Sequence, residues 1–168
     1  ITQAPIFWMD KRFQGRPDII QKTPGPSKFG DYHYIVKEIK YAKNIKLHHI
    51  LQAAFYNKIL GHIQGYTPEE FILINNDADE FSYSYAEYEA LLEETIASAR
   101  SILEGDMVPS PIHGEDYPWS SLSKELAEAS ADLSLLAGVG RSVRDPLNVA
   151  GIQNLQDFLD APQDVVLS

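Results

Sequence analysis

Three short groups of residues near the start of the chain contain the side-chain types that a phosphoryl-transfer site needs. They are Gly15-Arg16-Pro17-Asp18, Glu38-Ile39-Lys40, and Gln52 with Tyr56. Carboxylate oxygens are the ligands that Mg²⁺ prefers in proteins, and a lysine is a compact cation that can sit beside a phosphate. Each group alone is common, so the prediction depends on all three occurring in this order.

The expected strands would bring the charged groups together. Residues two apart on a strand share a face, so Glu38 and Lys40 should project together while Ile39 points away. If the strand that carries Asp18 pairs beside them, two carboxylates and the Ile39 carbonyl form an oxygen-only site for Mg²⁺ or Mn²⁺. Such a metal would activate a bound water and neutralise developing charge, and Lys40 would orient the water or donate to a phosphate oxygen.

A long predicted helix supplies the third group. Gln52 and Tyr56 are four residues apart and therefore share one helix face, from which they would hold Lys40 or the DNA backbone. His48 and His49 open the same helix. One of them could face the site, but a capping or packing role is the favoured interpretation.

Ordinary explanations exist for each pattern. A Glu-x-Lys sequence on a strand usually forms a surface ion pair that contributes less than about 1 kcal/mol. A Pro-Asp sequence often does no more than start a turn. The order and placement of the three groups on strand, strand and helix favour the joint interpretation as a site.

Periodicity and turn residues predict an α/β core followed by a helical tail. We expect strands at 5–9 and 16–22 with Gly15 near the turn between them, and then a loop from Thr23 to Ser27 that ends near Gly30 and Asp31. A central strand over 32–42, a helix over 46–63, short strands at 71–74 and 80–85, and a helix over 86–104 follow. A proline-containing loop over 105–118 forms a boundary, and short helices complete the chain from residue 120.

Composition bounds the class of protein. The 168 residues are 44 % hydrophobic and contain no cysteine, and no apolar run approaches the roughly 18 residues of a membrane span. We therefore expect no membrane partner and a cytoplasmic location. The chain begins with Ile1 and ends abruptly at Ser168, which suggests a piece of a longer protein.

The charge is unevenly distributed along the chain. The net charge is −10, yet residues 1–60 contain ten Lys and Arg against four acids, and the remainder contains four against twenty. A local basic field of this kind can hold phosphates while the rest of the surface repels them. An unevenly charged, solvated surface is the equally weighted alternative.

The three motifs together resemble the PD-(D/E)XK nuclease superfamily, and within it the RecB-like branch, over roughly residues 5–105. The resemblance implies a restriction-endonuclease-like mixed sheet core flanked by helices, within a nuclease domain at 1–108. It implies metal binding by Asp18 and Glu38, catalysis by Lys40, and support from Gln52 and Tyr56. The family also supplies an earlier acidic or His residue from an N-terminal helix, which we expect upstream of this chain.

A connecting segment at 109–130 resembles the place where many RecB-like nucleases carry iron–sulfur cysteines. Here the corresponding positions hold His113, a residue near Asp116 or Tyr117, and Ser123. A serine hydroxyl does not replace a thiolate on iron, so no iron–sulfur cluster is expected. A zinc site built on His113 is the less favoured alternative.

Residues 131–168 resemble a helix-hairpin-helix tail, around Leu133 to Gly140 and Ala150 to Ile152. In such a hairpin, Gly138 and Gly140 would let backbone N–H groups approach a DNA phosphate, and Arg141 and Arg144 would add charge. Pro146 should interrupt a helix begun at Arg141, so Asp145 and Pro146 could instead start it. The alternative is a packing motif in which glycine only ends a helix.

The resulting hypothesis is a Mg²⁺- or Mn²⁺-dependent DNA nuclease that hydrolyses phosphodiesters in single-stranded DNA or at DNA ends. Its expected DNA contacts are Arg16, Lys43, Lys46, Gly138, Gly140 and Arg141. The resemblance further implies a helicase partner or fused helicase domain and a repair or recombination role. The alternatives are a non-catalytic DNA-binding or scaffold module with the same fold, and a structural protein with neither activity.

Overall fold

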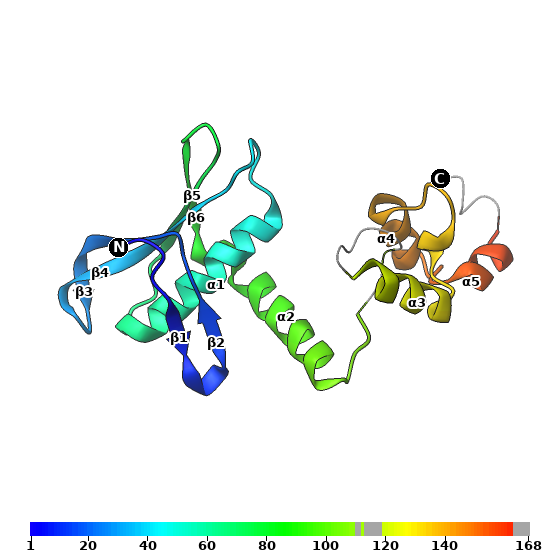
Figure 1. The fold of residues 1–168 in the computed structure, drawn as a ribbon, viewed down its shortest axis with the longest axis horizontal. Coiled ribbons are helices and arrows are strands. Elements are labelled where there is room, and N and C mark those ends of the chain that lie inside the picture. Colours follow the sequence, from blue (N-terminus) through cyan, green and yellow to red (C-terminus); the bar gives the residue numbers. More distant parts are fainter. Residues whose placement is uncertain (110–111, 113–118, 163–168) are drawn as a thin grey trace. The chain divides into compact units, whose positions relative to one another are not determined.

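The computed structural model describes residues 1–109, 112 and 119–162. The chain divides into two compact units, Ile1–Leu103 (unit 1) and Glu104–Ser168 (unit 2). Unit 1 contains the strands and the long helices, and the described residues of unit 2 form short helical elements (Figure 1). The helix of the predicted connecting segment 109–130 belongs to the same unit as the tail.

A four-stranded mixed sheet forms the centre of unit 1. Its strands lie in the order β3 (Ile19–Ser27), β4 (Gly30–Ile39), β5 (Glu70–Ile74) and β6 (Glu80–Ser84). β4 pairs antiparallel with β3 and parallel with β5, and β5 pairs antiparallel with β6. The parallel pair is joined by the crossover helix α1 (Leu47–Gln64), as parallel strands require. The predicted α/β class is confirmed.

The N-terminal hairpin differs from the expected one. β1 (Ile6–Trp8) pairs antiparallel with β2 (Phe13–Gly15), and the 3-10 turn η1 (Met9–Lys11) joins them. Arg12 closes this turn in a left-handed conformation, with φ at 54°. Gly15 therefore ends a strand instead of forming the turn, and β3 begins only at Ile19. A turn built without Gly, Pro or Asn gave no local signal.

The segment predicted as a loop from Thr23 to Ser27 belongs to β3, so that prediction is wrong. β3 is an edge strand, where prolines are tolerated because their missing N–H groups can face away from the neighbouring strand. The pairing with β4 is regular up to Pro24 and shifts between Pro24 and Ser27. The shift absorbs the proline-glycine sequence without ending the strand.

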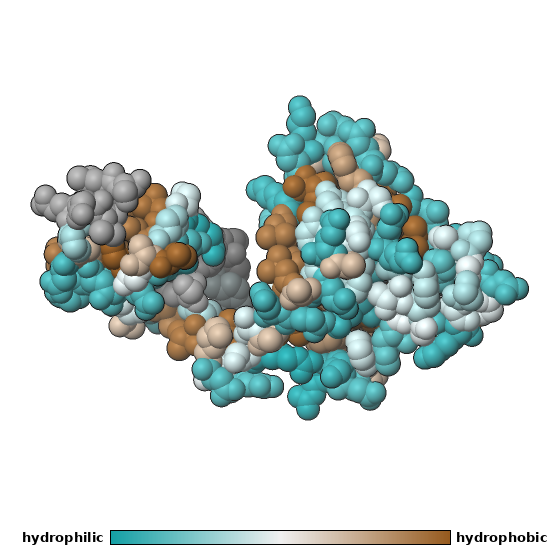
Figure 2. All heavy atoms as spheres, turned by 180° about the vertical axis from the view of Figure 1, so that it is seen from behind, coloured by the Kyte–Doolittle hydropathy of each residue, from teal (hydrophilic) through white to brown (hydrophobic). Residues whose placement is uncertain are grey.

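Two helices pack the core of unit 1. α1 lies against β4 and β5, and α2 (Tyr85–Glu104) follows β6 directly. The fully buried side chains at the centre include Val36, Ala54, Phe71 and Leu73. Figure 2, which shows one face of the molecule, has mostly hydrophilic side chains on the larger body, with hydrophobic patches between them.

The boundaries of both long helices follow the predictions closely. Within α1, the apolar Leu47 is 51 % exposed, whereas the polar Asn57 and Gln64 are fully buried. Their amides reach backbone partners: Asn57 donates to the carbonyl of Pro68, and Gln64 pairs with the backbone of Tyr34. Both ends of the Gln64 amide thus have partners, whereas Oδ1 of Asn57 is buried with no hydrogen-bond partner among the described residues.

Unit 2 consists of short helical elements. They are α3 (Ser120–Ser130), η2 (Leu133–Leu135), α4 (Arg141–Val149) and α5 (Leu155–Asp160). Arg144 is buried, and its guanidinium lies 3.0 Å from the Asp145 carboxylate and 3.6 Å from that of Asp132. This ion pairing inside the unit gives Arg144 a structural role, unlike the DNA contact considered for it.

α4 begins at Arg141 and continues through Pro146, so the alternative start at Asp145 is wrong. Gly140 precedes the helix, and its carbonyl accepts from the N–H groups of Val143 and Arg144. Pro146 removes one hydrogen-bond donor from the interior of the helix. The nine-residue helix nevertheless continues to Val149.

Within the described part of the chain, no helix has both the length and the apolar character that crossing a membrane requires.

Candidate active site

Two hydrogen bonds from backbone N–H groups to carboxylates connect Asp18 with Glu38 and Ile39, where β3 begins and β4 ends. The N–H of Asp18 donates to Oε2 of Glu38 at 3.1 Å, and the N–H of Ile39 donates to Oδ2 of Asp18 at 2.9 Å. The antiparallel pairing of β3 with β4 produces this crossing, because Ile19 lies opposite Lys37. Asp18 directly precedes β3 and Glu38 belongs to β4, so the two residues are adjacent in space.

Glu38 is an acid held in a poorly solvated position. Its side chain is 6 % exposed, and this burial raises the pKa of its carboxyl above the usual 4.5. The Asp18 N–H bond and the Lys40 ammonium lower that pKa and oppose the effect of burial, while the Asp18 charge adds to it. A divalent cation at this place would stabilise the ionised form that burial disfavours.

Lys40 connects the carboxylates with α1. Its Nζ donates to Oε1 of Glu38 at 3.1 Å and to Oε1 of Gln52 at 2.6 Å. The other end of the Gln52 amide donates to the hydroxyl of Tyr56 at 2.9 Å. The result is a hydrogen-bonded chain from Glu38 through Lys40 and Gln52 to Tyr56, which fixes the position of the ammonium group.

Gly15 leaves space for Tyr56, the last residue of this series of hydrogen bonds. A Cβ atom at Gly15 would lie 2.6 Å from Cδ1 of the Tyr56 ring, closer than real Cβ contacts. The glycine thus lets the strand β2 pass against the face of Tyr56. The Gly-Arg-Pro-Asp sequence contributes at both ends, since its first residue packs on Tyr56 and its last faces Glu38.

The donor chemistry of this place fits a hard divalent cation. Each carboxylate oxygen of Asp18 and Glu38 accepts one hydrogen bond and has a second lone pair for a metal. The N–H of Ile39 points toward Asp18, and on a strand the carbonyl of the same residue points to the same side. The predicted third ligand, the Ile39 carbonyl, therefore faces the Asp18 side of β4.

Carboxylate side chains alone do not supply a full coordination shell for a metal at this site. Among the described residues, no cluster of three or more His, Cys, Asp or Glu side chains is arranged to hold a metal ion. Two carboxylates, one carbonyl and several waters are nevertheless the kind of shell in which Mg²⁺ is bound next to phosphate substrates. The site thus fits a metal shared with water and substrate.

Two basic residues come shortly after Lys40 in the sequence. Lys43 and Lys46 are exposed in the connection between β4 and α1, three and six residues after Lys40. Burial, and then the charges of His48, Lys40 and Lys46, lower the pKa of His49. His49 accepts a hydrogen bond from the N–H of Lys46 at 3.2 Å, so it caps α1, as favoured from the sequence.

The other predicted DNA contacts divide between the two units. In unit 1, Arg16 donates from Nε to the carbonyl of Gln3 at 3.4 Å. In unit 2, Gly138 has a φ of +84°, Gly140 precedes α4, and Arg141 is its first residue. Both glycines lie in the connection between η2 and α4, and the helix-hairpin-helix assignment and the contact with DNA stay predictions.

The predicted iron–sulfur remnant is only partly visible. His113, Asp116 and Tyr117 lie outside the described residues. Ser123 is buried in α3, and its hydroxyl donates to the carbonyl of Ile112 at 3.0 Å. At this position the serine therefore fastens Ile112 to α3.

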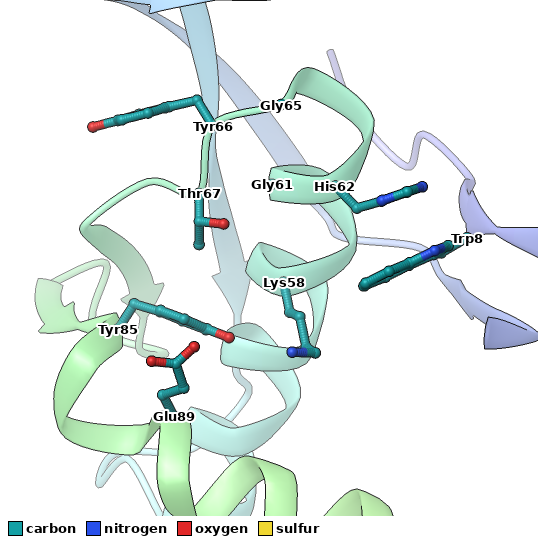
Figure 3. A pocket seen from close by; sticks show the side chains of 9 residues that line it. All are labelled: Trp8, Lys58, Gly61, His62, Gly65, Tyr66, Thr67, Tyr85 and Glu89. Carbon is teal, nitrogen blue, oxygen red and sulfur yellow. The ribbon is translucent and has the colours of Figure 1, made fainter. Parts of the chain in front are cut away.

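A separate hollow of about 230 Å³ lies beside α1 (Figure 3). By helical spacing, the α1 residues that line it, among them Gly61 and His62, are on the opposite side of the helix from Gln52 and Tyr56. The lining of the hollow includes Trp8 stacked on His62 with ring centres 4.0 Å apart. Burial and nearby glutamates raise the pKa of Tyr85, at the base of the hollow, to about 12. This hydroxyl stays protonated at neutral pH and is unsuited to act as a base.

Sequence reasoning missed one residue beside the carboxylates. The side chain of Gln3 donates to Oδ1 of Asp18. A single glutamine fifteen residues before Asp18 belongs to no motif, and only the pairing of the first residues with the start of β3 brings it there. No signal in one sequence would have identified it.

Comparison of the chain with protein-family models found no matching family, and a search of curated proteins found no significant match.

Proposed function

We propose that the protein is a divalent-metal-dependent nuclease that hydrolyses phosphodiester bonds in DNA, with its active centre at Asp18, Glu38 and Lys40. The observation that supports this most is the bridging of Glu38 and Gln52 by the Lys40 ammonium, beside the hydrogen-bonded pair of Asp18 and Glu38. Such a set combines oxygen ligands for a metal with one fixed cation, and metal-dependent phosphodiester hydrolysis can use both.

Each side chain would have a distinct task. Asp18, Glu38 and the Ile39 carbonyl would hold Mg²⁺ or Mn²⁺, which when bound supplies charge neutralisation and a more acidic water. Lys40 would donate to a non-bridging phosphate oxygen or hold the attacking water by hydrogen bonding. Gln52 keeps the ammonium in place, and Tyr56 keeps Gln52 in place.

The motif order further supports placing the chain with restriction-endonuclease-like folds and the RecB-like branch. A mixed sheet with a helix crossing between its parallel strands, and the three motifs at the strand ends and on that helix, agree with this proposal. The same proposal includes single-stranded DNA or DNA ends as substrate, the hairpin of unit 2 as a second phosphate contact, and action beside a helicase in repair or recombination. A cytoplasmic location belongs to it as well.

Cleavage of labelled DNA in the presence of Mn²⁺ tests the proposal. We expect wild-type protein to cleave and Lys40→Ala to lose at least about 100-fold in rate, as for other groups that stabilise transition-state charge. Lys37→Ala is the matched control, since Lys37 lies in β4 three residues before Lys40, has a similarly exposed side chain (13 % against 14 %) and pairs with Glu80 instead. Equal rates for wild type and Lys40→Ala would refute the proposal.

The hydrogen bonds of the site also support a second candidate, a DNA-binding scaffold without catalysis. Both carboxylates accept backbone N–H groups and would stabilise the strand ends without any metal. Mn²⁺ calorimetry separates the candidates, because a scaffold needs no metal binding that depends on Asp18 and Glu38.

A further inference from the structure

The first three residues lie along the beginning of β3 and contact the segment that ends in Asp18. Thr2 forms an isolated antiparallel bridge with Ile19, and the N–H of Ile20 donates to the carbonyl of Ile1 at 2.9 Å. Gln3 then leaves this alignment with a φ of +51°, in the left-handed region that non-glycine residues seldom adopt. Such a conformation persists only where surrounding contacts hold it.

Three hydrogen bonds join Gln3 to the Arg16-to-Asp18 segment. Its N–H donates to the carbonyl of Asp18 at 2.9 Å, and its own carbonyl accepts from Nε of Arg16 at 3.4 Å. Its side-chain amide donates to Oδ1 of Asp18 at 2.5 Å. The turned backbone thus directs both the N–H and the carboxamide of one residue at one aspartate.

This arrangement gives the Asp18 carboxylate a donor on each oxygen. Gln3 donates to Oδ1, and the N–H of Ile39 donates to Oδ2 at 2.9 Å. A carboxylate held at both oxygens does not rotate freely about its side-chain bonds. Its remaining lone pairs therefore keep a fixed direction relative to Glu38, whose own carboxylate accepts from the Asp18 N–H.

We propose that Gln3 is a positioning residue for metal binding, whose carboxamide holds the Asp18 carboxylate ready to bind a divalent cation together with Glu38. This inference rests on the proposed function, because it assumes that Asp18 is a metal ligand. Partners that orient metal ligands contribute about 10- to 100-fold to metal affinity in other proteins. The Ile39 N–H still holds one oxygen when Gln3 is changed, so we expect the lower end of that range.

Calorimetric measurement of Mn²⁺ binding to the full 168-residue chain tests this inference. Gln3→Met keeps the length of the side chain but removes its donor, and Gln21→Ala changes an exposed glutamine on β3 as a control. We expect Gln3→Met to weaken Mn²⁺ binding about tenfold and Gln21→Ala to leave it unchanged. In the cleavage assay, the Mn²⁺ concentration for half-maximal rate should rise by the same factor, with the maximal rate recovered at saturating Mn²⁺.

Two results would overturn the inference without affecting the proposed function. One is wild-type Mn²⁺ affinity in Gln3→Met, and the other is a lower maximal rate and melting temperature with unchanged Mn²⁺ affinity, which marks a purely structural role. If Gln3→Met disturbs packing, the Mn²⁺ affinity of Gln3→Ala is compared with that of wild type instead, because this substitution removes the donor and adds no bulk.

Asp18→Asn distinguishes failure of the inference from failure of the proposed function. We expect this variant to lose Mn²⁺ binding. If Asp18→Asn binds Mn²⁺ as tightly as wild type, or if wild type binds none, then the metal site itself is wrong, and the role of Gln3 fails with it.

Discussion

The backbone N–H of Asp18 donates to the carboxylate of Glu38 at 3.1 Å, so the side chain of one predicted metal ligand fixes the backbone of the other. The converse bond runs from the N–H of Ile39, next to Glu38, to the Asp18 carboxylate. Two strand ends are thereby fastened by the side chains that would bind a cation. Stability and metal binding are linked at this point of the fold, and several predictions depend on that link.

The first prediction concerns how Lys40 is held. Gln52→Met removes the oxygen that accepts from Nζ of Lys40 at 2.6 Å, so the ammonium loses one of its two fixed partners. We expect the maximal cleavage rate to fall about tenfold, because catalysis depends on precise placement. Mn²⁺ affinity should change little, since Gln52 contacts neither carboxylate. Steady-state cleavage rates at saturating Mn²⁺ measure the effect.

The loss of cleavage rate in Tyr56→Phe can be compared with that in Gln52→Met. Tyr56→Phe retains the ring and removes only the hydroxyl that accepts from the Gln52 amide at 2.9 Å. The loss should be smaller than for Gln52→Met, because Tyr56 acts on Lys40 only through Gln52. A larger loss for Tyr56→Phe would mean that the tyrosine contacts the substrate directly.

The second prediction concerns the glycine that faces Tyr56. Gly15→Ala places a Cβ 2.6 Å from Cδ1 of the ring, so either β2 or the ring must move. Overpacking of this kind costs about 1–3 kcal/mol in the free energy of unfolding. Urea denaturation should show this loss, and cleavage should slow as Tyr56 moves away from Gln52.

A double variant checks the cause. Tyr56→Ala removes the atoms with which the new methyl group would collide. In the Tyr56→Ala background, Gly15→Ala should therefore destabilise the protein much less, with a coupling energy of about 0.5–3 kcal/mol. Strictly additive losses would show that Gly15 is required for a reason other than the Tyr56 ring.

The third prediction is a pH dependence caused by Glu38. Burial raises the pKa of this carboxyl above 4.5 in the folded protein, so the folded state binds the proton more tightly than the unfolded chain. The contribution of Glu38 to the free energy of unfolding is then greatest below the unfolded pKa and is lost as pH rises through the folded pKa. Mn²⁺ binding must displace this proton, so metal affinity should rise with pH over the same interval.

Denaturation in EDTA from about pH 4.5 to about pH 8 measures this contribution. The stability of wild type relative to Glu38→Gln should decline as pH rises, because only wild type must bury a charge at this position. A difference between the two proteins that stays constant over this range would contradict the assigned cause.

The fourth prediction concerns the basic connection between β4 and α1. Replacing both Lys43 and Lys46 by Gln should weaken binding to labelled single-stranded DNA and lower the salt dependence by about 0.7 per lost phosphate contact. Lys11→Gln, at the tip of the β1–β2 hairpin, serves as the control for lost charge elsewhere. Fluorescence anisotropy over a range of salt concentrations gives both quantities. An equal effect of Lys11→Gln would indicate general electrostatic attraction.

Local patterns predicted much of unit 1. The boundaries of α1, β5 and α2 lie within about one residue of those expected, because amphipathic periodicity and turn residues are properties of a short sequence window. The rule that residues two apart on a strand share a face also predicted that the side chains of Glu38 and Lys40 would lie together. Their charged groups are 3.1 Å apart.

Features that depend on distant parts of the chain were not predictable in this way. The proline-containing half of β3 is a strand because of its position at the edge of the sheet, which no local window contains. Gln64 is buried because it pairs with the backbone of Tyr34, thirty residues earlier. Gln3 reaches Asp18 only through the pairing of the first residues with β3.

Diffraction from crystals soaked in Mn²⁺ tests the central claim most directly, because the anomalous signal locates the ion itself. We predict a peak about 2–2.5 Å from carboxylate oxygens of both Asp18 and Glu38, and no such peak in Asp18→Asn crystals. Density for Mn²⁺ elsewhere, with none between these two residues while DNA cleavage still requires the metal, would contradict the account.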